Sequence, residues 1–97
     1  MRSSGEAFEK LGQIVDTVGH VGLRRAIDEA NQAVATGGIG VVLRAPDDAP
    51  PPRYAISIRR EEVLFVHGTC TGSVPRTALD GLVRAAEANA AAAGMQM

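Results

Sequence analysis

The sequence predicts an α+β domain in which helices cover a three-stranded antiparallel sheet, in the order helix, helix, strand, strand, strand, helix. Three observations lead to this prediction. Residues 39–67 carry short apolar, β-branched runs separated by turn residues. The segments on either side repeat apolar residues at helical spacing. A sheet with one apolar face needs a cover, which the helices supply in a two-layer arrangement.

Composition limits the functions that the chain can have. Its 97 residues suffice for a single compact domain with a modest core. A net charge of −1 provides no global field that would attract nucleic acid or a membrane. A single cysteine excludes an intramolecular disulfide, and no apolar run reaches transmembrane length, so we expect a cytoplasmic protein. The basic residues are nearly all arginine, which together with abundant alanine indicates GC-rich coding.

The N-terminal segment, residues 1–20, is expected to form an amphipathic helix. Ser3 and Glu6 have the spacing of a capping box, in which each side chain satisfies an amide of the first turn. Apolar residues then recur at helical spacing and form one stripe: Phe8, Leu11, Ile14, Val15 and Val18. Of these, Phe8, Leu11 and Val15 are candidate interaction residues, because this helix precedes a complete helix–sheet unit.

That unit spans residues 21–97, and the helix can pack on it, cover its open sheet face or pair with a second copy of the chain. Dimerisation through this helix or through an exposed edge strand is the resulting hypothesis. A second helical pattern covers about residues 23–36, with an apolar stripe of Leu23, Ile27, Ala30 and Val34. Gly19 and Gly22 leave open whether residues 4–36 form one helix or two, since each glycine inside a helix costs about 1 kcal/mol relative to alanine.

Three strands are predicted next. The first is Ile39–Ala45, and the second, Arg53–Arg59, alternates between Tyr54, Ile56 and Ile58 on one face and Arg53, Ala55, Ser57 and Arg59 on the other. The third is Val63–His67, joined to the second by a tight hairpin. Residues 47–52 contain three prolines and are expected to form a rigid connection between antiparallel strands.

The last helix is predicted from about Val74 to Ala92. Residues 68–73 are expected to form a loop before it, with Ser73 as the N-cap and Pro75 in the first turn. The apolar stripe of this helix consists of Leu79, Leu82, Val83 and Ala86.

From Leu23 onward the order of elements resembles the double-stranded-RNA-binding domain. Residues 54–58 resemble its second strand, and residues 68–73 resemble the glycine-containing stretch that leads into its final helix. Small and apolar residues of the last helix resemble that family's packing positions: Ala78, Leu82, Ala85 and Ala86. The resemblance implies an α-β-β-β-α fold and binding of RNA duplexes. The family places a lysine cluster at the start of its last helix, where this chain offers only Arg76.

RNA binding therefore depends on where the arginines lie. Residues 21–97 carry eight arginines and eight acidic residues, so this part of the chain is neutral overall. Duplex binding draws its affinity from several phosphate contacts. A neutral domain must gather its arginines on one surface to make them, and the candidates are Arg53, Arg59, Arg76 and Arg84.

A catalytic cysteine is the third hypothesis. Cys70 and Arg76 have the C-x5-R spacing that resembles the phosphate-binding loop of cysteine phosphatases, in which a helix N-terminus and an arginine hold an oxyanion. Pro75 removes one amide from such a loop, and no acid partner is identifiable, so a loop cysteine beside a helix cap is the favoured interpretation. With only His20 and His67 as further ligands, no metal or cofactor is expected.

The sequence thus favours a non-catalytic interaction protein, an adaptor, regulator or inhibitor that binds another protein or a second copy of itself. Small size, near-neutral charge and the lack of a catalytic constellation support this prediction, and size and compactness suggest an origin in a phage or another mobile element. RNA binding on the double-stranded-RNA-binding-like scaffold is the alternative, and an enzyme that uses Cys70 comes third.

Overall fold

The computed structural model of the protein describes residues 4–95, which form three helices and one four-stranded antiparallel sheet. The helices are α1 (Ser4–Val18), α2 (His20–Ala35) and α3 (Arg76–Met95), and the strands are β1 (Gly40–Arg44), β2 (Tyr54–Arg59), β3 (Glu62–His67) and β4 (Cys70–Pro75). The predicted α+β class is confirmed. The predicted cap at Ser3 lies outside the described residues.

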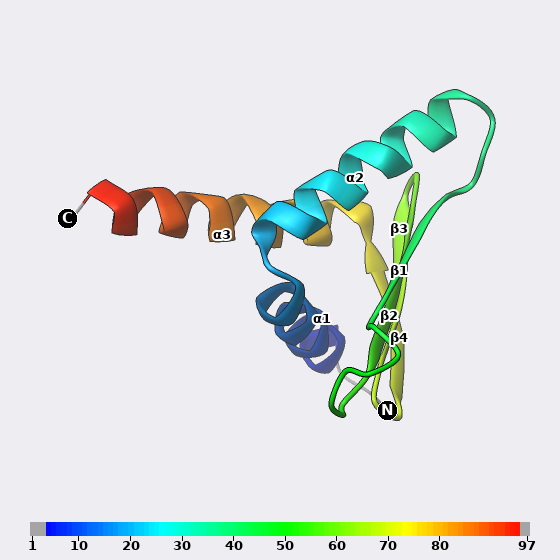
Figure 1. The fold of residues 1–97 in the computed structure, drawn as a ribbon. Coiled ribbons are helices and arrows are strands. Elements are labelled where there is room, and N and C mark those ends of the chain that lie inside the picture. Colours follow the sequence, from blue (N-terminus) through cyan, green and yellow to red (C-terminus); the bar gives the residue numbers. More distant parts are fainter. Residues whose placement is uncertain (1–3, 96–97) are drawn as a thin grey trace.

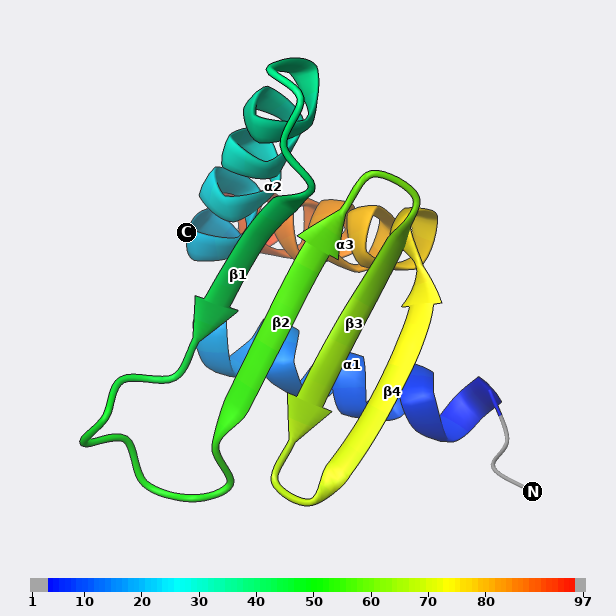
Figure 2. The ribbon, with the colours of Figure 1, turned by 90° about the vertical axis from the view of Figure 1, so that its right-hand side faces the viewer.

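The molecule has two layers. The strands follow one another across the sheet in chain order, β1-β2-β3-β4, with each neighbouring pair antiparallel. Figure 1 shows the sheet edge-on with α1, α2 and α3 all on one side of it. Figure 2 looks onto the opposite face, with the strands in front and the helices behind them. We call the side that the helices cover the inner face and the other side the open face.

The prediction of three strands is wrong, because the stretch expected to be a loop forms β4. Gly68, at φ +64°, turns the chain, and its N–H donates to the carbonyl of Arg53 at 2.7 Å. β4 then pairs with β3 along its whole length, from His67 opposite Cys70 to Glu62 opposite Pro75. The strand departs from the α-β-β-β-α order that the resemblance implies. It also moves the start of the last helix from Val74 to Arg76, so Ser73 is a strand residue rather than a cap.

The N-terminal third of the chain forms two helices rather than one. Gly19 separates them with φ +89°, in the region that favours glycine, while its N–H still donates to the carbonyl of Val15 at 2.8 Å. α2 begins at His20, earlier than the predicted Leu23, because Gly22 is accommodated inside its first turn. The two glycines therefore have different roles, and only Gly19 interrupts the helix.

The core lies between the inner face and the helices. The predicted alternation in β2 is confirmed, with Ile56 and Ile58 buried. The other strands contribute Val63, Phe65 and Val74, and the helices contribute Leu11, Ile14, Val15, Leu23, Ala26, Ile27, Ala30, Leu79 and Val83. Apolar burial on this one face stabilises the fold, since the hydrophobic effect scales with the apolar area removed from water.

α3 is longer than the layer it covers. Its first half supplies Leu79 and Val83 to the core, with Leu82 and Ala86 packed against it, as the predicted stripe requires. Residues 88–94 are all exposed. Figure 1 shows the C-terminal part of α3 running outward, away from the sheet. Its alanine-rich sequence favours helix by intrinsic propensity without tertiary contacts.

Candidate interaction surface

The open face is built from the outward-pointing residues of all four strands. Pairing of the strands sets these residues in rows that run across the sheet. One row is Val42, Ser57, Leu64 and Ser73, and the next is Arg44, Ala55, Val66 and Thr71. Arg59 of β2, paired with Gly40, and Glu62 of β3, paired with Pro75, lie in a further row at the hairpin end. Within residues 4–95, no helix or loop is laid over this face (Figure 2).

The centre of the open face is apolar. Val42 is 57% exposed and Val66 is 39% exposed, and Leu64 and Ala55 lie half-buried between them. Together with the small side chains of Ser57 and Ser73, they line a shallow hollow of about 480 Å³. Large apolar residues that share one exposed patch are the usual mark of an interaction site, whereas singly scattered ones are not.

β3 is the strand that makes this face unusual. Val63 and Phe65 point into the core, and Leu64 and Val66 point outward. A strand that is apolar on both sides is typical of a sheet that is covered on both faces, whereas a one-sided sheet alternates apolar and polar residues. β2 alternates in this second way, so the two central strands carry different patterns on the same surface.

Charged residues lie at the hairpin end of the open face. The guanidinium of Arg59 lies 4.0 Å from the carboxylate of Glu62, and its Nε donates to Ser57 Oγ at 3.4 Å. The side chains of Arg59 and Glu62 are 41% and 53% exposed, so water screens the ion pair and the pair adds little to stability. The opposite charges therefore remain available to a partner.

The candidate residues of α1 lie mostly in the core of their own domain. Leu11 and Val15 are buried against the sheet and the other helices, whereas Phe8 is 47% exposed. Of the three surfaces considered for this helix, it therefore packs on its own domain. Phe8 is the one member of the three that a partner could reach in the folded chain.

The four candidate arginines do not gather on one surface. Arg53 directly precedes β2 and Arg59 ends it, so they lie roughly 20 Å apart at the rise of an extended strand. Arg84 is exposed on α3, which belongs to the layer on the other side of the sheet. Arg76 lies at the start of α3 with only 11% of its side chain exposed.

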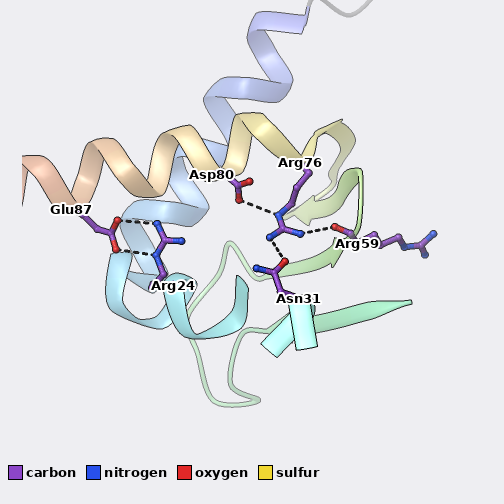
Figure 3. Close-up of polar contacts among 6 residues, drawn as sticks. All are labelled: Arg24, Asn31, Arg59, Arg76, Asp80 and Glu87. Carbon is purple, nitrogen blue, oxygen red and sulfur yellow. Dashed lines mark hydrogen bonds and ion pairs between the residues drawn. The ribbon is translucent and has the colours of Figure 1, made fainter. Parts of the chain in front are cut away.

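Arg76 is held by contacts to three elements (Figure 3). It donates to the carboxylate of Asp80 at 3.1 Å, to the carbonyl of Arg59 at 3.0 Å and to the side-chain oxygen of Asn31 at 2.8 Å. These bonds join the start of α3 to α2 and to the end of β2. The guanidinium is therefore committed to the fold, and its role is structural.

A second arginine clamps the helix layer. Arg24 of α2 donates through two nitrogens to the two carboxylate oxygens of Glu87 on α3, at 3.1 and 3.0 Å (Figure 3). This hydrogen-bonded contact lowers the pKa of Glu87 and raises the pKa of Arg24. Both side chains are still more than a third exposed, so the pair orients the two helices more than it stabilises them.

Cys70 does not occupy a phosphate-binding loop. Residues 70–75 are the extended strand β4, and Cys70 pairs with His67 across the turn. The backbone of these residues is therefore extended and does not form a loop that could wrap an oxyanion against a helix N-terminus. The described residues contain no group of three or more histidine, cysteine or acidic side chains placed to hold a metal ion. Among residues 4–95, no helix combines the length and apolarity needed to cross a membrane.

Comparison with known proteins adds no relative: no protein-family model, no curated protein and no solved structure matches this chain. The surface must therefore be interpreted from its own chemistry. Sequence reasoning missed the open face as a site, although it carried a signal in the unbroken apolar run at residues 63–66.

Proposed function

We propose that the protein is a non-catalytic interaction protein that binds another protein chain through the open face of its sheet. The observation that carries the proposal is the exposure of Val42 and Val66 around the half-buried Leu64, on a sheet face that no part of residues 4–95 covers. Covering these side chains with a partner removes apolar area from water, which is the main driving force of most protein association.

The layout of the face supports a protein partner rather than a small molecule. Small-molecule sites are concave and bury most of their ligand. The hollow on the open face is shallow, and its lining is spread over all four strands. An apolar centre with charged residues at its end matches the core-and-rim pattern of protein interfaces.

RNA binding on a double-stranded-RNA-binding-like scaffold is the second candidate. The antiparallel sheet with helices on one side is compatible with that layout. The separation of Arg53 from Arg59 and the engagement of Arg76 favour the protein-binding proposal over it, because duplex binding needs several convergent phosphate contacts.

The proposal is tested by photo-crosslinking in cells that encode the protein. A photoreactive phenylalanine analogue replaces Val42 or Val66 on the open face, or Val21 on α2 as the matched control. Val21 is a comparably exposed valine on the helix side, 63% against 57% for Val42. We expect covalent adducts of one defined mass from positions 42 and 66 and none from position 21.

The mass of the adduct identifies the partner, as another protein or as a second copy of the chain. Equal crosslinking at all three positions, or no adduct from either open-face position, would contradict the proposal. A purified folded sample of each variant, checked by circular dichroism, separates loss of binding from loss of structure.

A further inference from the structure

The open face is complementary in size to itself. In the row of Val42, Ser57, Leu64 and Ser73, large and small residues alternate from β1 to β4. The row of Arg44, Ala55, Val66 and Thr71 follows the same order of larger and smaller residues. β1 and β3 thus carry the larger outward side chains of these rows, and β2 and β4 carry the smaller ones.

This alternation suits a dimer in which two open faces are stacked about a twofold axis. The axis lies between the two sheets, runs parallel to the strands and passes over the line midway between β2 and β3. Rotation about this axis lays β2 of one copy over β3 of the other, and β1 over β4. Leu64 then faces the partner's Ser57, and Val66 faces the partner's Ala55. Val42 faces the partner's Ser73 in the same way. Every large apolar side chain of the face meets a small one, which is the interdigitation that face-to-face sheet packing requires.

The same axis pairs the charges. Arg59 and Glu62 lie at the same height on β2 and β3, because their neighbours Ile58 and Val63 are paired. The rotation therefore sets Arg59 opposite the partner's Glu62, and Glu62 opposite the partner's Arg59. Two copies form two such pairs. A surface with one sign of charge would instead repel its own copy.

We propose that the occupant of the open face is a second copy of this chain, packed sheet to sheet about that twofold axis. This inference rests on the proposed function and identifies its partner. An interface in which the same patch serves both subunits is the commonest arrangement in homo-oligomers. It also provides the cover that the two-sided apolar pattern of β3 calls for.

The size of the face sets the strength of the dimer. Four strands about 4.8 Å apart and about 20 Å long give a plan area of roughly 400 Å² for each copy. Stable interfaces bury about 800 Å² for each partner. The side chains add area to this flat estimate, but the face still lies toward the lower end of the interface areas found in stable complexes. We therefore expect a dimer that dissociates on dilution in the micromolar range.

Sedimentation velocity of the purified chain, from about 1 µM to 1 mM under reducing conditions, tests the inference. We expect the wild type to change from monomer to dimer within this range. Leu64→Asp places a charge at the centre of the face and should weaken the dimer about 100-fold or more. Arg84→Glu, an exposed arginine on the helix side, is the control and should leave the dimer unchanged.

Charge exchange tests the axis itself. Arg59→Glu and Glu62→Arg each convert two facing attractions into repulsions, and each should weaken the dimer about 10-fold at low salt. The double variant Arg59→Glu with Glu62→Arg restores opposite charges and should return to within about threefold of the wild type. We expect the fold to tolerate these changes, because the side chains of Arg59 and Glu62 are 41% and 53% exposed and Arg76 contacts only the backbone carbonyl of Arg59.

A chain that stays monomeric up to 1 mM overturns the inference, as does a dimer that ignores Leu64→Asp. Single and double charge variants that are equally weak overturn the proposed axis and with it the proposal. If the chain is monomeric but position 42 crosslinks to a different protein in cells, the proposed function survives and the second-copy inference fails. If neither self-association nor any adduct is found, both fail.

Discussion

The two faces of this sheet carry similar apolar residues in very different surroundings. On the inner face, Ile58 and Val63 have no exposure, whereas on the open face Val42 and Val66 remain 57% and 39% exposed. The open face differs in the residues between them, since Ser57 and Ser73 are polar and small. Burial of such groups without hydrogen-bond partners is costly. The comparison teaches that the face with more apolar residues, and without small polar ones between them, becomes the permanent core.

Glycine contributes to the same choice. Phe65 is a bulky side chain of the inner face, and its ring lies over Gly72 of β4. A strand residue with a side chain at this position would collide with the ring. On the inner face, a bulky residue and a position without a side chain thus fit together within a single sheet.

Truncation of one residue on each face should give the largest difference. Ile58→Ala removes a fully buried side chain and is expected to lower the free energy of unfolding by about 3–4 kcal/mol. Val42→Ala removes a mostly exposed one and should change it by less than about 0.5 kcal/mol. Urea denaturation at low protein concentration, where copies do not associate, measures both. Similar losses in the two variants would refute the assignment of the faces.

Addition of one carbon to each face should give an intermediate difference. In Gly72→Ala the new Cβ would lie 2.9 Å from Cζ of Phe65, so the ring or the strand must move, at a cost of about 1–3 kcal/mol. Ser73→Thr adds a methyl group to the neighbouring position on the open face and should stay within about 0.5 kcal/mol. Thermal unfolding compares the two variants, and a costly Ser73→Thr would show that the open face is already filled.

The smallest effect concerns the layer that covers the inner face. The pKa of Glu87 is lowered by its hydrogen bonds from Arg24, so this contact stabilises the fold above the ordinary value of 4.5 and is lost as the pH falls through the lowered pKa. Glu87→Gln should therefore be less stable than the wild type at pH 7 and approach it near pH 3. Melting temperatures across this range measure the difference. Glu29→Gln, on an exposed part of α2, is the control, and parallel curves for all three proteins would contradict the prediction.

Much of this fold could be predicted from the sequence, because periodicity reports burial directly. The alternation in residues 53–59 and the stripe of Leu79, Leu82, Val83 and Ala86 both placed the right residues against the core. β4 was missed because an edge strand with one buried side chain, Val74, has almost no pattern of its own. Gly68 and Gly72 favour a loop in the sequence, and the ring of Phe65 explains why Gly72 belongs in a strand.

The candidate site was less predictable for a related reason. Leu11 and Val15 are buried in their own domain, but the sequence leaves open whether the first helix packs on its own sheet or on a partner, because its apolar stripe is the same in both cases. The arginines were named by type, and their separation is a property of the folded chain. The run of apolar residues in β3 indicates that both faces of this strand favour burial. Which face the helices leave open can be recognised only in the folded chain.

The outward course of α3 has a practical consequence. Since residues 88–94 leave the molecule on the helix side, a fluorophore, affinity tag or tethered domain joined beyond Met95 is carried away from the open face. The last turns act as a rigid spacer of about 1.5 Å per residue. A fusion at that end therefore leaves the strands accessible, whatever partner they bind.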